Sequence, residues 1–242
     1  MKVEDNLQVW QESYAWSAEG DEWSAEWGGP DAQWYWAIFP RIHTVLPCET
    51  ILEIAPGFGR WTQYLRHLCQ NLEIVDLAPK CIEYCQRRFK DSSNIRYHVN
   101  DGMTLQMVSD HCVDFAFSFD SLVHVEVNVI DSYINELSSK LKVNGIAFLH
   151  HSNLAECQVD DTATRHGRAS SVGAKIFCDL CAKYDISCIS QEIIDWGGCP
   201  SLDCLSMITP QASRWARPTA ILRNDRFMDS AHMIRSFAAL YR

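Results

Sequence analysis

The sequence predicts a doubly wound α/β fold, in which a mostly parallel sheet carries helices on both faces. Two observations lead to this prediction. From Thr50 onward, short apolar runs alternate with segments whose apolar residues recur at helical spacing, and a Gly-rich turn separates the first run from the first helix. Because each helix returns the chain to the same end of the sheet, this alternation is typical of parallel strands joined by right-handed crossovers.

Five strands with four intervening helices, three of them long, are expected up to residue 151. Each strand is a short apolar run that ends at a turn, and each long helix has apolar residues on one face. The expected strands are residues 51–55, 72–78, 94–99, 113–120 and 145–151, and the expected long helices are residues 60–70, 80–90 and 129–142.

The alternation loosens after His151, where residues 155–170 are polar and irregular. The elements expected beyond them are a helix over 171–184, strands over 186–194 and 204–210, and a C-terminal helix over 228–241. Two late strands joined by a loop are typical of an antiparallel edge on an otherwise parallel sheet.

Residues 1–46 differ from the rest of the chain, and we expect them to form a helical lid over the main domain, residues 47–242. They hold six of the nine tryptophans, and eight acidic residues against two basic ones. A Gly-Gly-Pro break at residues 28–30 divides them, and the short helix after it should end near Pro40. Because so short a segment has no core of its own, its tryptophans must bury their rings against the main domain.

The charge balance argues against a nucleic-acid partner. The chain carries 21 basic and 31 acidic residues, for a formal net charge of −10, whereas duplex or tRNA binding normally needs a basic face that neutralises phosphates. No apolar run reaches the roughly 18 residues that a membrane span needs, and the N-terminus shows no secretory leader. We therefore expect a cytoplasmic protein without a membrane span; its oligomeric state, a homo-oligomer included, stays open.

The cysteines are expected to be reduced, and we predict no bound metal. Their number, 11, is odd, and reduced thiols are the default in the cytosol. The Cys81/Cys85 and Cys178/Cys181 pairs lie within helix-like patterns, where small apolar side chains suit a buried face. Neither pair has the second pair or the histidines that a zinc site needs. The acidic pair at residues 160–161 is expected in a solvated loop.

The strongest functional signal is the turn that follows the first strand. Gly57 and Gly59 leave the backbone N–H groups open to a ligand, because a Cβ there would block a close approach. A dinucleotide site would need Gly or Ala at residue 62 to bring the helix close to a pyrophosphate, but this chain has Thr62. The carboxylate of Glu53, within the strand, would repel a pyrophosphate. The turn therefore predicts a ligand with an ammonium group and no phosphate.

Polar clusters follow the next three strands, at the edge of the sheet where open α/β folds bind ligands. Asp76, followed by Leu77, ends the second strand, where a carboxylate can accept both ribose hydroxyls. The third strand is followed by a cluster in which a side chain can reach an adenine amino group while a glycine leaves room for the ring. The clusters are Asn100, Asp101 and Gly102 after the third strand, and Phe119 and Asp120 at the end of the fourth.

Together these motifs resemble the class I S-adenosylmethionine (SAM)-dependent methyltransferases. Residues 51–61, ILEIAPGFGRW, resemble the first motif of that family, E-x-G-x-G-x-G, with Ala55 in place of its first glycine and Pro56 before Gly57. The resemblance runs from Thr50 to His151 and implies a Rossmann-like sheet. It also implies a cofactor site formed by Glu53, Ala55, Pro56, Gly57, Gly59, Asp76, Leu77, Asn100, Asp101, Gly102, Phe119 and Asp120.

The resemblance implies an enzyme that transfers the methyl group of SAM and releases S-adenosylhomocysteine (SAH). The segments FSFDSLVHVE and GIAFLHHSNL, with the Trp-rich N-terminus, are similar to methyltransferases of bacterial polysaccharide and glycan biosynthesis. The acceptor is then a hydroxyl of a sugar or glycan, and aromatic rings suit such an acceptor because they stack on its C–H surfaces. Two alternatives stay open: O- or N-methylation of a small natural product or metabolite, and a SAM-binding protein without turnover.

A hydroxyl acceptor needs a base, and histidine is the usual choice near neutral pH. His124, His150 and His151 follow the fourth and fifth strands, at the edge expected to face the methyl group. We predict that His124 is the base, with an acid limb of the pH–rate profile at about pH 6–7. His150 or His151 would bind or orient the acceptor, and only one of the two can face the crevice from a regular strand. Asp120 or Glu126 would orient an imidazole.

The prediction of the cofactor can be tested by calorimetry. We expect SAM and SAH to bind with micromolar affinity, and NAD and ATP not to bind, because Thr62 and Glu53 disfavour a pyrophosphate at the turn. Binding of NAD that is tighter than that of SAM would contradict the prediction.

Overall fold

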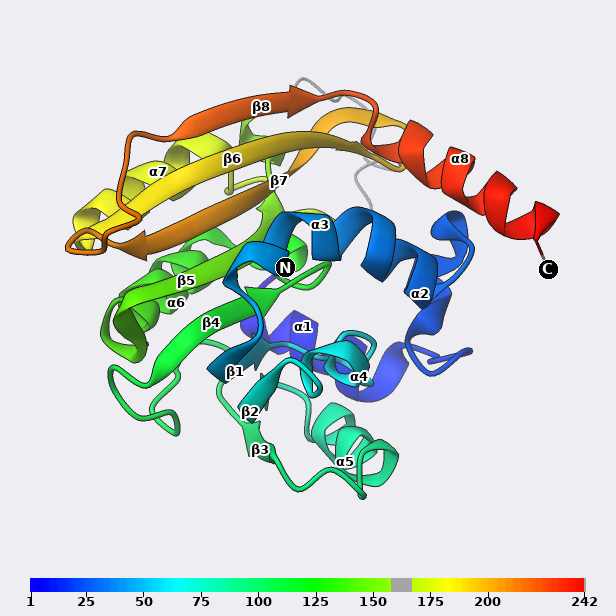
Figure 1. Cartoon of the computed structure of the whole chain (residues 1–242), viewed down its shortest axis with the longest axis horizontal. Coiled ribbons are helices and arrows are strands. Elements are labelled where there is room, and N and C mark those ends of the chain that lie inside the picture. Colours follow the sequence, from blue (N-terminus) through cyan, green and yellow to red (C-terminus); the bar gives the residue numbers. More distant parts are fainter. Residues whose placement is uncertain (158–166, 242) are drawn as a thin grey trace.

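One eight-stranded sheet runs through the computed structural model, which describes residues 1–157 and 167–241 (Figure 1). Its strands, in the order in which they lie side by side, are β3 (Ile95–Val99), β2 (Cys69–Asp76), β1 (Cys48–Ile54), β4 (Val113–Ser118), β5 (Leu141–Ser152), β7 (Cys199–Pro210), β6 (Ile186–Trp196) and β8 (Ala220–Asn224). Strands β1 to β5 are parallel, and β7 is antiparallel to both β5 and β6. The predicted parallel sheet with an antiparallel edge is confirmed.

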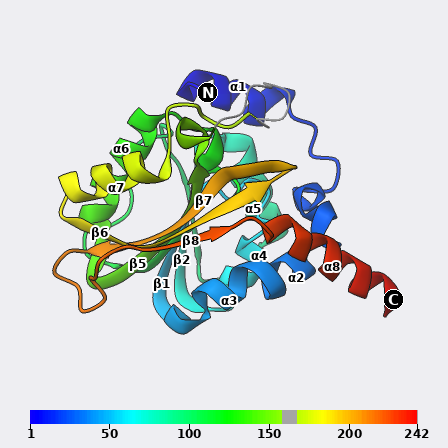
Figure 2. The ribbon, with the colours of Figure 1, turned by 90° about the horizontal axis from the view of Figure 1, so that it is seen from above.

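Helices cover both faces of the sheet (Figure 2). The helices of the main domain are α4 (Thr62–Leu65), α5 (Pro79–Arg88), α6 (Val127–Lys140), α7 (Ala174–Lys183) and α8 (Phe227–Leu240). Neighbouring residues of one strand enter different clusters, since strand side chains alternate between the faces. Ile51 packs with residues of α5, α8 and the N-terminal helices, whereas Leu52 packs with residues of α6 and α7.

The N-terminal segment divides into two parts at Gly28 and Gly29, as expected from its break. Residues 1–27, here called the strap, contain α1 (Val3–Gln8), a π-helical turn η1 (Val9–Ser13) and a 3-10 helix η2 (Asp21–Trp27). The second part consists of α2 (Pro30–Gln33), η3 (Trp34–Ile38), α3 (Phe39–Ile42) and η4 (His43–Val45). Trp34, Ile38 and Ile42 of this second part are buried in the cluster that α8 shares. The second part is therefore built into one face of the main domain.

Two of the helix predictions are wrong: one helix is shorter than predicted, and one does not form. The helix expected over residues 60–70 ends at Leu65, because the main chain from Cys69 onward pairs with β1. Four helices were expected between the first five strands, but the one expected between β3 and β4 is absent. There, residues 100–112, all of them described, form turns and bends.

Two further differences concern local residue preferences. The helical segment that begins at Pro30 does not stop near Pro40 but continues to Ile42. Pro40 lies in the first turn of α3, directly after the π-helical turn η3, and a missing N–H is tolerated at such a position. Strand β8 was not expected, because its residues are exposed on both faces and show no alternation of apolar and polar side chains.

The cysteines, possible metal sites and possible membrane spans can be described for residues 1–157 and 167–241. All eleven cysteines lie in this part, and none of them forms a disulfide. No group of side chains in these ranges could hold a metal ion. Asp160 and Asp161 lie outside the described residues. None of the described helices has the length and apolar character needed to cross a membrane.

The contact between α8 and the N-terminal helices yields a stability prediction. We expect Phe227→Ala to lower the free energy of unfolding by about 3–5 kcal/mol, because the Phe227 ring is 2% exposed and packs between Trp27 and Trp196. Urea denaturation measures the loss. Phe237→Ala, at a 47% exposed position of the same helix, should stay within about 0.5 kcal/mol of wild type. Equal losses in the two variants would contradict the packing argument.

Candidate active site

The turn after β1 is the first wall of the site. Ala55, Gly57 and Gly59 have φ angles of 57°, 58° and 86°. This left-handed region favours glycine, so Ala55 holds a strained backbone where the resembling family has glycine. A Cβ at Gly59 would lie 2.5 Å from the Phe89 ring, and one at Gly57 would lie 2.9 Å from the Trp16 ring. Both glycines are therefore required by close neighbours as well as by φ.

Glu53 stabilises this turn from beneath. It is 1% exposed, and Thr62 donates a hydrogen bond from Oγ1 to its Oε2 at 2.6 Å. Its other oxygen has no partner among the described residues. Burial raises the pKa of Glu53 to about 8, against the opposing effect of the Thr62 hydrogen bond. In the sequence, Thr62 was notable only because a dinucleotide site would need Gly or Ala there. In the structure, its hydroxyl group holds Glu53 in place.

Asp76 connects the ends of β1 and β2. Gly57 N–H donates to its Oδ2 at 3.1 Å, and Ala78 N–H donates to its Oδ1 at 2.8 Å. The side chain is 7% exposed, and burial raises its pKa to about 6 although these N–H groups favour the carboxylate. Asp76 thus fixes the glycine turn while it also lines the cavity described below.

The cluster after β3 is held mostly by its own loop. Asn100 donates to the Thr104 carbonyl at 2.8 Å and to the Tyr133 hydroxyl at 3.1 Å, and its Oδ1 accepts from Gly102 N–H. Asp101 Oδ1 accepts from the N–H groups of Met103 and Thr104. Of the three predicted residues only Gly102 lines the cavity. The two polar side chains therefore shape the loop and leave its glycine facing the ligand space.

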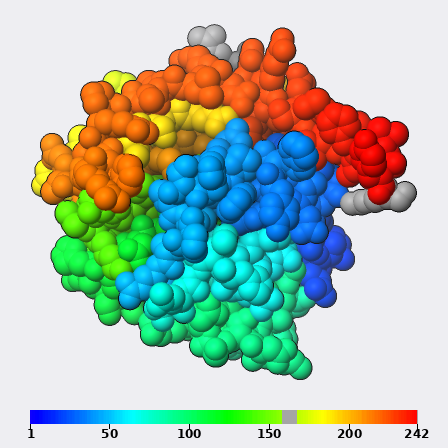
Figure 3. Space-filling view, in the orientation of Figure 1, coloured from blue at the N-terminus to red at the C-terminus, as the bar shows by residue number. Residues whose placement is uncertain are grey.

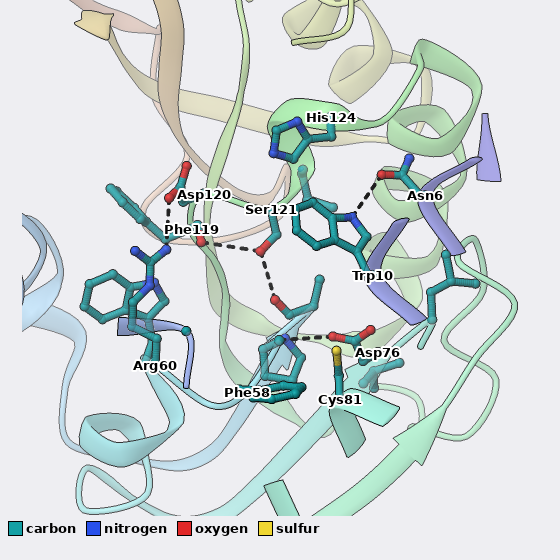
Figure 4. Close-up of a pocket in the computed structure, with 18 of the residues that line it drawn as sticks. Asn6, Trp10, Phe58, Arg60, Asp76, Cys81, Phe119, Asp120, Ser121 and His124 are labelled. Atoms are coloured by element: carbon teal, nitrogen blue, oxygen red, sulfur yellow. Dashed lines mark hydrogen bonds and ion pairs between the residues drawn. The ribbon is translucent and has the colours of Figure 1, made fainter. Parts of the chain in front are cut away.

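A cavity lies between these strand ends and the strap (Figure 4). The empty space within it, together with the open solvent at its mouth, is about 930 Å³. The predicted cofactor residues that line it are Ala55, Pro56, Gly57, Asp76, Leu77, Gly102, Phe119 and Asp120, whereas Glu53 and Gly59 lie behind the turn. The strap contributes Asn6, Trp10, Trp16, Gly20 and Trp23 to the opposite side.

Comparison with known proteins identifies the domain. Residues 51–145 match the family model described as "Methyltransferase domain". This segment of the chain is therefore similar to a methyltransferase domain. The match begins in β1 and ends in β5, so it covers the glycine turn, Asp76 and the ends of β3 and β4.

Relatives of this methyltransferase domain are distant. The chain is 23% identical over 140 residues to "Ribosomal RNA small subunit methyltransferase A" of Coxiella burnetii, covering 57% of this chain and 53% of that protein. It thus spans about half the length of that curated relative. The fold is similar to the "PH0226 protein" of Pyrococcus horikoshii OT3 (TM-score 0.55, 19% identity, 75% of this chain and 93% of the other). It is also similar to the protein of the "DhpI-SAH complex" (TM-score 0.54, 16% identity, 86% and 96%).

A buried ion network that the sequence did not reveal lies at the cavity wall formed by Arg60 and Asp120. Asp120 has a φ angle of 62°. Its Oδ2 accepts a hydrogen bond from Arg60 Nη2 at 2.9 Å, and its Oδ1 lies 3.5 Å from Arg168 Nη2. Arg168 also pairs with the fully buried Asp203 of β7 at 2.7 Å. The Arg168 guanidinium holds the pKa of Asp203 well below its usual range, and the hydrogen bond from His150 adds to this effect. The positive charges of Arg60 and Arg168 thus offset the negative charges of Asp120 and Asp203 in a buried environment.

The geometry of His150 fixes its tautomer. Asp120 N–H donates to His150 Nδ1 at 3.0 Å, so this nitrogen carries no proton. His150 Nε2 therefore carries the proton and donates it to Asp203 Oδ2 at 3.1 Å. Both nitrogens are engaged, and the ring is fully buried and does not line the cavity. His150 is a member of the ion network and orients Asp120, the reverse of the relation expected from the sequence.

His151 lies on the other face of the sheet. Its ring stacks on Phe177 of α7 at 4.1 Å between centroids, and Nδ1 and Nε2 contact the Ser152 carbonyl and the Ser206 hydroxyl. Burial lowers its pKa to about 4. The structure therefore separates His151 from the cavity, as strand alternation requires of one member of the pair.

His124 is the predicted histidine that lines the cavity (Figure 4). It is held in the 3-10 turn η5 (Leu122–His124) after β4, and its Nδ1 donates to the Gly167 carbonyl at 3.0 Å. This bond leaves Nε2 as the nitrogen with a free lone pair. The His124 ring lies 5.6 Å from the Trp10 ring. Burial lowers its pKa to about 4, with a smaller effect from Arg168, so the imidazole is neutral at neutral pH.

The raised pKa of Asp76 predicts a pH-dependent affinity for the product SAH. As the pH falls from about 7 to about 5, protonation of a group with a pKa of about 6 removes a charged acceptor for ribose hydroxyls. We expect the SAH dissociation constant of wild type to rise over this range by calorimetry.

Asp76→Asn should bind SAH more weakly, by about 1.5–3 kcal/mol at pH 7.5 as for a charged hydrogen bond, and without this pH dependence. Asp229→Asn, at an exposed position in the first turn of α8, serves as the matched control and should follow wild type. If Asp76→Asn retains the pH dependence, another group is responsible for it.

Proposed function

We propose that this protein transfers the methyl group of SAM to a hydroxyl of a small acceptor, best a sugar or glycan unit, with His124 as the base. The observation that supports this most directly is the unprotonated Nε2 of His124 on a cavity-lining side chain whose Nδ1 is fixed by Gly167. The other predicted catalytic residues are engaged elsewhere: Asp120 binds arginine, His150 binds Asp203 and His151 contacts Ser206.

The residues at the strand ends fit a SAM ligand. Asp76 offers a carboxylate that would accept hydrogen bonds from two ribose hydroxyls, and Leu77 and Gly102 line the same cavity, where the adenine ring would lie. When bound, SAM supplies an activated methyl group on a sulfonium. The backbone around Gly57 also lines the cavity, where it would hold the methionyl part of the ligand.

The chemical step needs little more than position and a base. In our proposal the acceptor oxygen forms a bond to the methyl carbon while the carbon–sulfur bond breaks, and the electron pair of that bond stays on sulfur. The hydroxyl proton passes to His124 Nε2. A neutral imidazole can accept this proton at pH 7, and since the pKa of His124 is lowered to about 4, we move the expected acid limb from about pH 6–7 to about pH 4.

The cavity wall supports a small acceptor with C–H surfaces. The Trp10 and Trp23 rings lie 6.4 Å apart on the strap side, and aromatic faces stack on sugar C–H groups. The curated relative named above is a ribosomal RNA methyltransferase, yet this chain has a net charge of −10. An acidic surface disfavours a polyanion, so we keep the small acceptor.

A second candidate is N-methylation of a small amine, and one observation favours it. The low pKa of His124 makes it a weak base, and a neutral amine needs no strong base to attack a methyl group. Tryptophan rings would also stabilise the ammonium product through cation–π contacts. A panel assay of SAH release with sugars, sugar nucleotides, phenols and amines separates the two acceptor classes.

The base assignment predicts a loss of turnover in His124→Gln. With the best acceptor of the panel, we expect kcat to fall by about 10²- to 10⁴-fold, while the SAH dissociation constant changes little. Wild-type kcat should stay level from about pH 8 to pH 5 and fall as the pH approaches about 4, since protonation removes the lone pair.

His43→Gln, which changes an exposed histidine outside the cavity, is the matched control. If His124→Gln keeps more than about a third of kcat, far more than loss of a base allows, positioning alone carries the reaction and the amine acceptor is favoured.

A further inference from the structure

The strap contacts each of the three segments assigned to the cofactor. Trp16 and Gly20 lie against the glycine turn, where added Cβ atoms at Gly57 and Gly20 would meet Trp16 and Phe58. Gln11 accepts a hydrogen bond from the Lys80 N–H at the start of α5, directly after Asp76 and Leu77, at 3.0 Å. These contacts cover the methionyl and ribose ends of the expected ligand.

The third contact is at the adenine end. A Cβ at Gly102 would lie 3.1 Å from Cγ1 of Val3 in α1. The strap therefore follows the cofactor segments in order along the cavity, from the loop after β3 to the turn after β1. Five strap residues line the same cavity as the cofactor candidates, so a ligand there would touch both.

Trp16 has the closest contact of the strap with the glycine turn. Its ring stacks on Phe58 at 4.2 Å and 9°, and Phe58 stacks in turn on Tyr84 of α5 at 3.9 Å and 8°. Its indole Nε1 is buried and has no partner among the described residues. A buried donor without a partner costs about 1–3 kcal/mol, and Trp16 lines the cavity, where a carboxylate ligand would satisfy it.

A bridge from the main domain holds the strap in this position. Arg88 donates from Nη1 to the Phe58 carbonyl at 2.9 Å and to the Glu19 carbonyl at 3.3 Å. Arg60 donates to Ser24 of the strap at 3.3 Å as well as to Asp120. The strap is therefore tied to the two sides of the cavity, next to the turn and next to the ion network.

We propose that the strap is one wall of the cofactor site and that Trp16 is a cofactor-binding residue, its indole N–H donating to the methionyl carboxylate. This inference rests on the proposed function only through the identity of the cofactor. It differs from a lid that serves the acceptor alone, because the strap then contributes to the affinity for SAM. Since the ligand contacts both surfaces, its binding stabilises the strap in this position.

The test measures SAH binding by calorimetry in the full chain. Trp16→Ala should weaken binding by about tenfold or more, and Trp16→Phe, which keeps a stacked ring without the N–H, should fall between Trp16→Ala and wild type. Trp36→Ala, at a 63% exposed position outside the cavity, is the matched control and should bind within about twofold of wild type.

A second measurement follows the strap itself. A glutamate-specific protease can cut the strap at Glu12, Glu19 or Glu22, and SAH should slow this cleavage in wild type but not in Trp16→Ala. If Trp16→Ala binds SAH within twofold of wild type, or SAH leaves the cleavage rate of wild type unchanged, the inference is overturned. If wild type binds no SAH at all, the cofactor assignment fails instead.

Discussion

The ion pairs of Asp120 are the interaction on which one wall of the cavity depends. A carboxylate and a guanidinium lose several kcal/mol each when they leave water, and only close pairing offsets that loss. Asp120 meets this condition with Arg60 on one oxygen and Arg168 near the other. The same residue has a positive φ, and its N–H binds the His150 imidazole. Loss of one partner would leave a buried charge uncompensated, so the wall tolerates little change.

The network also explains why elements far apart in sequence meet at the site. Arg60 comes from the turn after β1, Arg168 from the segment before α7, and Asp203 from β7. The antiparallel edge strand β7 is thus more than an extension of the sheet, since it places a fully buried carboxylate beside His150. Because Arg60 also binds Ser24, displacement of the strap would remove one hydrogen bond of Arg60. The position of the strap therefore affects the residue that pairs with Asp120.

Much of the parallel half of the fold and of the cofactor side follows from local patterns. The strands, the turn after β1 and the position of Asp76 at the end of β2 each depend on residues close together in the sequence. Periodicity and turn chemistry are therefore enough to predict them. The predictions fail where a non-local contact decides. Strand pairing of Cys69 with β1 shortens the helix after the turn, and β8 exists only because β6 offers it a free edge.

By itself, the sequence determined a doubly wound sheet and the order of its strand-end motifs. Only the tertiary structure decided which titratable groups face the cavity. Strand alternation turned His151 toward α7, pairing with Asp203 occupied His150, and a carbonyl of a distant loop fixed the lone pair of His124. The physical reason is that protonation and hydrogen bonding depend on partners brought together by folding, and here those partners lie 30 or more residues apart for His124 and His150.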